Sequence, residues 1–177
     1  MKKLILILMF SLSLVAGNLE LKSGFVGAHT EMLMDSTIDP LNTHLKADLS
    51  MSGDDILSLK GKLWLKMELF SSDESERDEH MDEAVNVDSF PLATYTVSSL
   101  TKKETKDNYV IHGTLNFHGQ EKAFMLDAEI KDSGNGIAIS ATSSFLVSDY
   151  GVEMPCMMFM CVRDKVDIFA KAVLLRK

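Results

Sequence analysis

The side chains best suited to chemistry in this sequence are sulfur-bearing residues clustered at positions 154–161. They are Met154, Cys156, Met157, Met158, Met160 and Cys161. In an oxidising compartment two such cysteines form a disulfide, so the first interpretation is a Cys156–Cys161 bond that closes a small loop. Thiolates and thioethers also select Cu(I), which makes the same six residues a candidate copper site. Methionine is also an adaptable apolar filler, so a third interpretation places the segment at a hydrophobic portal.

A second group of polar side chains, Arg77, Asp78 and His80, lies in the acidic stretch 71–87, which lacks the alternation of a strand. Arg77 or His80 could hydrogen-bond the head group of a ligand. The structural alternative is that Arg77 pairs with an acid, and for Asp78 we expect it to cap the following turn. Residues 82–87 could form a short helix.

The sequence lacks the spacings that identify common catalytic and metal sites. It contains no HExxH, G-x-S-x-G, Walker or G-x-G-x-x-G motif. Its histidines are scattered, and the acidic residues at 73–79 lack the spacing and the glycine of an EF-hand. We therefore expect a protein that is not an enzyme and that carries no cofactor.

Apolar and polar residues alternate with period two over most of the chain from Leu57 onward. The alternating segments are 57–69, 109–117, 124–131, 137–147 and 166–174. Alternation of this kind places one face of a strand in water and the other in a core, which is typical of antiparallel sheets. The short turn-rich sequences at 118–120 and 132–136 predict hairpins between neighbouring strands.

Segments 45–51 and 19–34 also have the character of strands, so about seven or eight strands and no long helix are expected. This pattern predicts an all-β sandwich or closed barrel. About eight strands close around one small ligand, and small residues on the inward faces favour a cavity. The expected lining is Leu63, Leu65, Met67, Tyr95, Ile111, Leu115, Phe117, Phe124, Leu126, Ile139 and Phe145. The alternative is that these side chains pack into a dry core.

Residues 1–17 have the layout of a secretory signal peptide. Lys2 and Lys3 precede an apolar run, and the small residues Ala16 and Gly17 follow it. Cleavage after Ala16 or Gly17 would leave one domain, 18–177. The apolar run is too short to cross a hydrocarbon core of ~30 Å as a helix, although an uncleaved membrane anchor is the alternative.

The charge of the chain argues against two kinds of partner, nucleic acids and membranes. The formal net charge is −8, and loss of the two signal-peptide lysines would lower it to −10. An acidic surface repels phosphate backbones and anionic lipid head groups, so we expect neither nucleic-acid binding nor stable membrane insertion.

Four blocks of the sequence resemble the YceI family, whose members are exported, lipocalin-like and polyisoprenoid-binding. The first joins Glu76-Arg77-Asp78-Glu79-His80-Met81 to Phe90-Pro91-Leu92-Ala93-Thr94-Tyr95. The others are 109–119, Ser148-Asp149-Tyr150-Gly151-Val152 and 163–168. The blocks run in the family's order from about Leu57 to the end. The family's usual amino-terminal strand motif is not evident at 24–31.

The resemblance implies an eight-stranded antiparallel lipocalin-like barrel with one short helix, here from 78–87, and a hydrophobic interior cavity. It also implies that the cavity holds an isoprenoid-like or other long-chain amphiphile. We therefore predict a periplasmic lipid carrier. The alternative is a periplasmic copper- or redox-linked protein that uses segment 154–161. The sequence leaves the ligand's identity and the formation of a homodimer open.

Overall fold

The computed structural model describes residues 16–31, 37–154, 156–157 and 160–177. The predicted signal peptide therefore lies outside the described residues, except for its last two positions. The first described residue, Ala16, begins a long strand that continues through the predicted cleavage region. Cleavage after Ala16 or Gly17 would remove only the first one or two residues of that strand.

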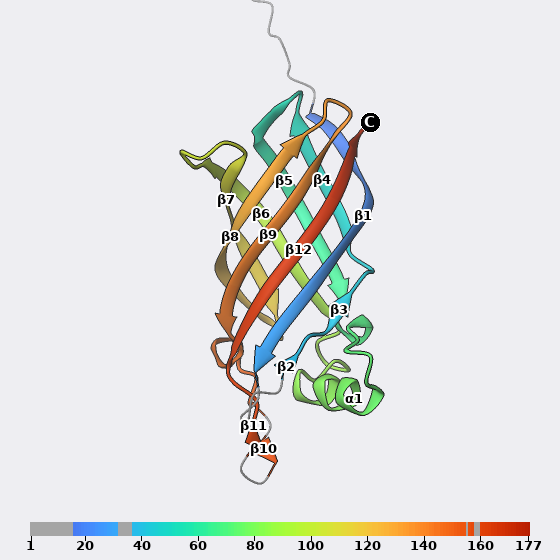
Figure 1. The fold of residues 1–177 in the computed structure, drawn as a ribbon. Helices are drawn as coiled ribbons and strands as arrows, with labels where there is room; N and C mark the ends of the chain where they lie inside the picture. The colour runs from blue at the N-terminus through green and yellow to red at the C-terminus, as the bar shows by residue number, and fades with distance from the viewer. Residues whose placement is uncertain (1–15, 32–36, 155, 158–159) are drawn as a thin grey trace, which may run out of the picture.

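Eight antiparallel strands form a closed barrel (Figure 1). Around the ring they are β1 (Ala16–Glu31), β4 (Lys46–Ser52), β5 (Asp55–Lys66), β6 (Leu92–Lys102), β7 (Asn108–Phe117), β8 (Gln120–Asp132), β9 (Gly136–Leu146) and β12 (Lys165–Arg176). The ring closes because β12 pairs with β1, from Leu19 opposite Arg176 to His29 opposite Asp167. The predicted eight-stranded barrel is confirmed.

The short elements gather at one end of the barrel, which we call the helix end. They are β2 (Thr37–Ile38), β3 (Leu41–Asn42), η1 (Met67–Leu69), α1 (Ser75–Ala84), η2 (Val147–Tyr150), β10 (Cys156–Met157) and β11 (Met160–Cys161). Figure 1 shows α1 and the β10–β11 hairpin at this lower end and the C-terminus at the opposite end, which we call the termini end. The long connections between barrel strands all occur at the helix end, together with the tight β7–β8 hairpin, whereas the connections at the termini end are all short.

The local sequence explains the tight β7–β8 hairpin. Only His118 and Gly119 separate the two strands, and both have positive φ angles, 49° and 71°. Two such residues form the turn whose twist matches that of the flanking strands. The hairpin predicted at 118–120 is therefore present.

The helix differs from the expectation in its position and in the role of Asp78. Helix α1 begins at Ser75, not at 78 or 82, so Asp78 lies inside it. The Asp78 carboxylate accepts hydrogen bonds from the Ser71 hydroxyl at 2.7 Å and from the Ser72 backbone N–H at 2.8 Å. The prediction that Asp78 caps the following turn is wrong, because its carboxylate binds the preceding loop instead.

The strand expected to continue to Leu69 stops at Lys66. Residues Met67–Leu69 form the short 3-10 helix η1. The Phe70 N–H donates to the Met67 carbonyl at 3.1 Å, which closes this turn. The apolar alternation of Met67 and Leu69 beyond Lys66 therefore does not reflect a strand.

Apolar side chains fill the barrel at the termini end. We call this group the plug; its members are Leu19, Met51, Leu100, Tyr109, Ile130, Ile137 and Leu174. Ile130 and Leu174 are each 0% exposed. The plug closes the termini end with a solid core, as close-packed protein interiors require.

An ion pair fastens the last strand to the β8–β9 turn at the termini end. The Arg176 guanidinium donates two hydrogen bonds to the Asp132 carboxylate, at 2.9 and 2.6 Å. These bonds lower the pKa of Asp132 below its usual value. Because the folded-state pKa is lowered, the stabilisation is present at neutral pH and is lost as the pH falls through the pKa of the folded state.

We expect Asp132→Asn to reduce the free energy of unfolding by about 1 kcal/mol at pH 7. The difference from the wild type should shrink as the pH falls from 7 through the lowered pKa of the wild-type carboxyl. Urea unfolding followed by circular dichroism at a series of pH values below 7 measures it. A difference that stays the same at every pH would contradict a charge-dependent contribution.

Candidate binding cavity

A cavity of about 970 Å³ occupies the barrel between the plug and the helix end. All eight barrel strands contribute to its wall. The structure places on this wall each predicted lining residue: Leu63, Leu65, Met67, Tyr95, Ile111, Leu115, Phe117, Phe124, Leu126, Ile139 and Phe145. The alternative, in which these same side chains fill a dry core, does not hold for this half of the barrel, because they surround a cavity.

The space inside the barrel comes from small side chains placed at one level. Ala141 on β9 pairs with Ala128 on β8 and with Ala170 on β12, so three neighbouring strands carry only methyl groups there. Ala141 and Ala170 both line the cavity. An eight-stranded barrel with large residues at these positions would fill its own interior.

The polar atom of Tyr95 is satisfied inside the wall. Its hydroxyl lies 3.1 Å from the carbonyl oxygens of Ile111 and Phe124, to which it can donate. Gly113 leaves the room for this, because a Cβ there would lie 2.5 Å from the Tyr95 ring. Burial raises the pKa of the Tyr95 hydroxyl, so it remains protonated. The phenol therefore contributes an apolar ring rather than a free polar group to the cavity.

The mouth of the cavity carries the charged residues. Arg77 and His80, the two predicted head-group contacts, border it from α1, together with the apolar Met81 of α1 and Val85, which follows the helix. The Arg77 guanidinium lies 3.0 Å from the Glu74 carboxylate. Arg77 thus pairs with an acid, as the structural alternative expected, and also borders the cavity.

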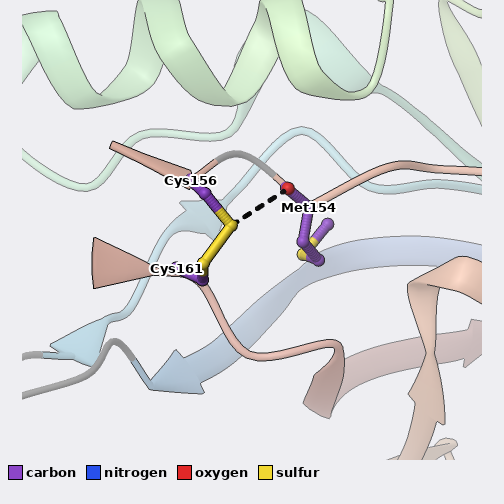
Figure 2. The surroundings of a disulfide bond; sticks show 3 residues. All are labelled: Met154, Cys156 and Cys161. Atoms are coloured by element: carbon purple, nitrogen blue, oxygen red, sulfur yellow. Dashed lines mark hydrogen bonds between the residues drawn. A yellow bond between two sulfur atoms is a disulfide. The ribbon is translucent and has the colours of Figure 1, made fainter. Parts of the chain in front are cut away.

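The sulfur-rich segment forms a small hairpin at the helix end. A disulfide joins Cys156 on β10 to Cys161 on β11, which are directly opposite each other (Figure 2). Met154, just before the hairpin, lines the cavity. The disulfide leaves no thiolate for Cu(I) in this oxidised form.

The rest of the candidate copper site is only partly described. Met158 lies outside the described residues, and the side chains of Met157 and Met160 are not described either. Among the described residues, no group of three or more His, Cys, Asp or Glu is arranged to hold a metal ion.

Several lining residues were not predicted. On β1 and β12 these include Val26, Ala28, Ile168 and Ala170, and on α1 they include Met81 and Ala84. The alternation of 166–174 was a usable signal for β12. Helix α1 gave no such signal, because its contribution depends on where a largely charged helix lies against the barrel.

A comparison with protein-family models finds a YceI-like domain over residues 17–174. The chain belongs to the YceI-like family. The match includes the amino-terminal strand, where the family's usual motif was not evident. No curated protein matches the sequence.

Solved YceI-like structures share the fold. BcnA from Burkholderia cenocepacia has a TM-score of 0.74 and 13% identity, covering 85% of this chain and 95% of that one. A polyisoprenoid binding domain from Saccharophagus degradans, implicated in plant cell wall breakdown, has a TM-score of 0.69 and 13% identity, covering 91% and 99%. A YceI protein from Campylobacter jejuni has a TM-score of 0.66 and 18% identity, covering 82% and 88%.

In the part of the chain that the structure describes, no helix is both long enough and apolar enough to cross a membrane. The family assignment, the barrel and its hollow half together define the cavity as the candidate functional site.

Proposed function

We propose that the protein is an exported carrier that sequesters an isoprenoid-like or other long-chain amphiphile in its barrel. The observation that carries the proposal is the cavity of about 970 Å³, whose wall inside the barrel is predominantly apolar. The polyisoprenoid binding domain from Saccharophagus degradans, which has the same fold, supports it. The ligand would enter tail first, with its head group left at the helix end.

The volume and the chemistry of the wall suit a long hydrocarbon chain. At about 30 Å³ for a group the size of a water molecule or a methylene, the cavity has room for roughly 30 such groups. Each CH₂ removed from water contributes about 0.8 kcal/mol. A chain of a dozen carbons or more therefore gains enough to offset the cost of ordering it, without any specific polar contact.

We also propose that the signal peptide directs the chain to the periplasm and is removed there. Strand β1 pairs with β12 from Leu19 onward, so cleavage after Ala16 or Gly17 leaves all of this pairing intact and removes only the first one or two pairs with β4. Amino-terminal mass mapping of the exported protein tests this directly. A mature chain that still carried Met1 would contradict the proposed cleavage.

Native mass spectrometry of protein purified from its own host, with and without reductant, tests the carrier function. We expect an adduct of lipid mass that disappears after organic extraction. A metal-ion increment that Cys156→Ser abolishes would support the copper alternative instead. A lipid-derived product that accumulates with time would show that the protein is an enzyme.

A further inference from the structure

The charged side chains that border the cavity are mostly acidic. Four glutamates border it, Glu74, Glu76, Glu83 and Glu153, against one arginine, Arg77, and one histidine, His80. Lys171 is the one other basic residue on the lining. It lies in the middle of β12, opposite Ser140 on β9, and so away from the helix end.

The single arginine at the mouth is already neutralised. Its Nη2 atom lies 3.0 Å from Oε2 of Glu74, and the Arg77 side chain is 28% exposed. Within the described part of the chain, Glu76, Glu83 and Glu153 take part in no ion pair. Pairing of Arg77 with Glu74 therefore leaves an excess of negative charge where a head group would lie.

The surroundings of the mouth add to this excess. Helix α1 also carries Asp78, Glu79 and Asp82. The pKa of Asp82 is raised by burial and by the neighbouring carboxylates of Asp78, Glu68 and Asp88. A raised pKa is the effect that nearby like charges have on an acid. The helix end therefore has a negative electrostatic potential.

We propose that the cavity selects amphiphiles whose head group is a cation, such as an ammonium, over amphiphiles of the same tail with a carboxylate or phosphate head. The proposal rests on the proposed function, because it assumes that the tail lies in the barrel. The wall of the barrel cannot discriminate between head groups, since it contacts only the tail. The acidic mouth can, because head groups of opposite charge meet opposite interactions there.

Three ligands with one tail test the proposal: hexadecylamine, hexadecanamide and hexadecanoate, each titrated by calorimetry below the concentration at which it aggregates. At about 10 mM salt, where charges act over about 30 Å, we expect the amine to bind at least about tenfold more tightly than the carboxylate, with the amide between them. In about 1 M salt, where screening acts within about 3 Å, the three affinities should converge.

A pair of charge-matched variants separates the mouth from the overall charge of the protein. The mouth variant carries Glu76→Gln, Glu83→Gln and Glu153→Gln. The control carries the same number of changes toward the termini end, namely Glu20→Gln, Glu104→Gln and Glu129→Gln; all three residues are exposed. We expect the mouth variant to lose most of the preference for the amine and the control to retain it.

The outcomes separate this inference from the proposed function. Equal affinities for the three ligands, or tightest binding of hexadecanoate, overturn head-group selection while leaving the carrier function in place. An equal loss of preference in both variants also overturns it, because the overall charge would then be the cause. If none of the three ligands binds, the carrier function fails, and this inference fails with it.

Discussion

Replacing Ala141 with phenylalanine is expected to weaken the binding of a long-chain ligand by at least about tenfold, and up to about a hundredfold. Ala141 lines the cavity at the level where β8, β9 and β12 carry only methyl groups. A phenylalanine ring there would occupy the space of several ligand carbons. Each displaced CH₂ removes about 0.8 kcal/mol, and about 1.4 kcal/mol is a factor of ten in affinity.

The matched control is Ala138→Phe on the same strand. Ala138 is exposed and lies three residues away on the outside of the barrel. Titration of hexadecanamide into both variants measures the effect, and circular dichroism shows whether each remains folded. Undiminished affinity in a folded Ala141→Phe protein would mean that the tail does not reach this level of the barrel.

The second large effect is expected in the plug. Leu174 is 0% exposed, and its replacement by alanine should reduce the free energy of unfolding by about 2–5 kcal/mol, through lost burial and the space left behind. The neighbouring Leu175 points outward and is 37% exposed. Leu175→Ala should change stability by less than about 1 kcal/mol. Urea unfolding of both variants gives the comparison.

The same substitution tests whether the plug limits the length of the bound chain. Removing the Leu174 side chain should deepen the cavity toward the termini end. In a series of fatty amides, the longest chain that binds tightly should then be longer for Leu174→Ala than for the wild type. An unchanged length limit in the folded variant would show that the plug is not the floor of the cavity.

The barrel could be predicted because alternation reports directly which face of a strand is buried. On β7, every second residue from Tyr109 to Phe117 faces inward and is buried, as the sequence pattern indicated. The alternation could not distinguish the half of the barrel that holds the cavity from the half that the plug fills. Ile137 belongs to the plug and Ile139 lines the cavity, although they are identical side chains two positions apart on β9.

The mouth was the least predictable part of the site. The sequence singled out Arg77 and His80, and the structure places both there. It did not indicate that Glu83 and Glu153, seventy positions apart, border the same opening. Long connections set their positions, and the charge and turn preferences of a connection do not determine where it packs against a barrel. Helix α1 begins at Ser75 instead of at the expected position for the same reason, because it lies within one of these long connections.

The pairing of β1 with β12 makes the enclosed interior depend on the last strand of the barrel. Leu19 lies opposite Arg176, so the ring cannot close fully until β12 has been synthesised. Contacts between such distant parts of a sequence form late and slowly. Until then β1 and β9 present unpaired edges, and the barrel encloses no cavity. Ligand binding is therefore a step that follows the synthesis of β12, and a chain truncated before β12 would have no cavity in which to hold a ligand.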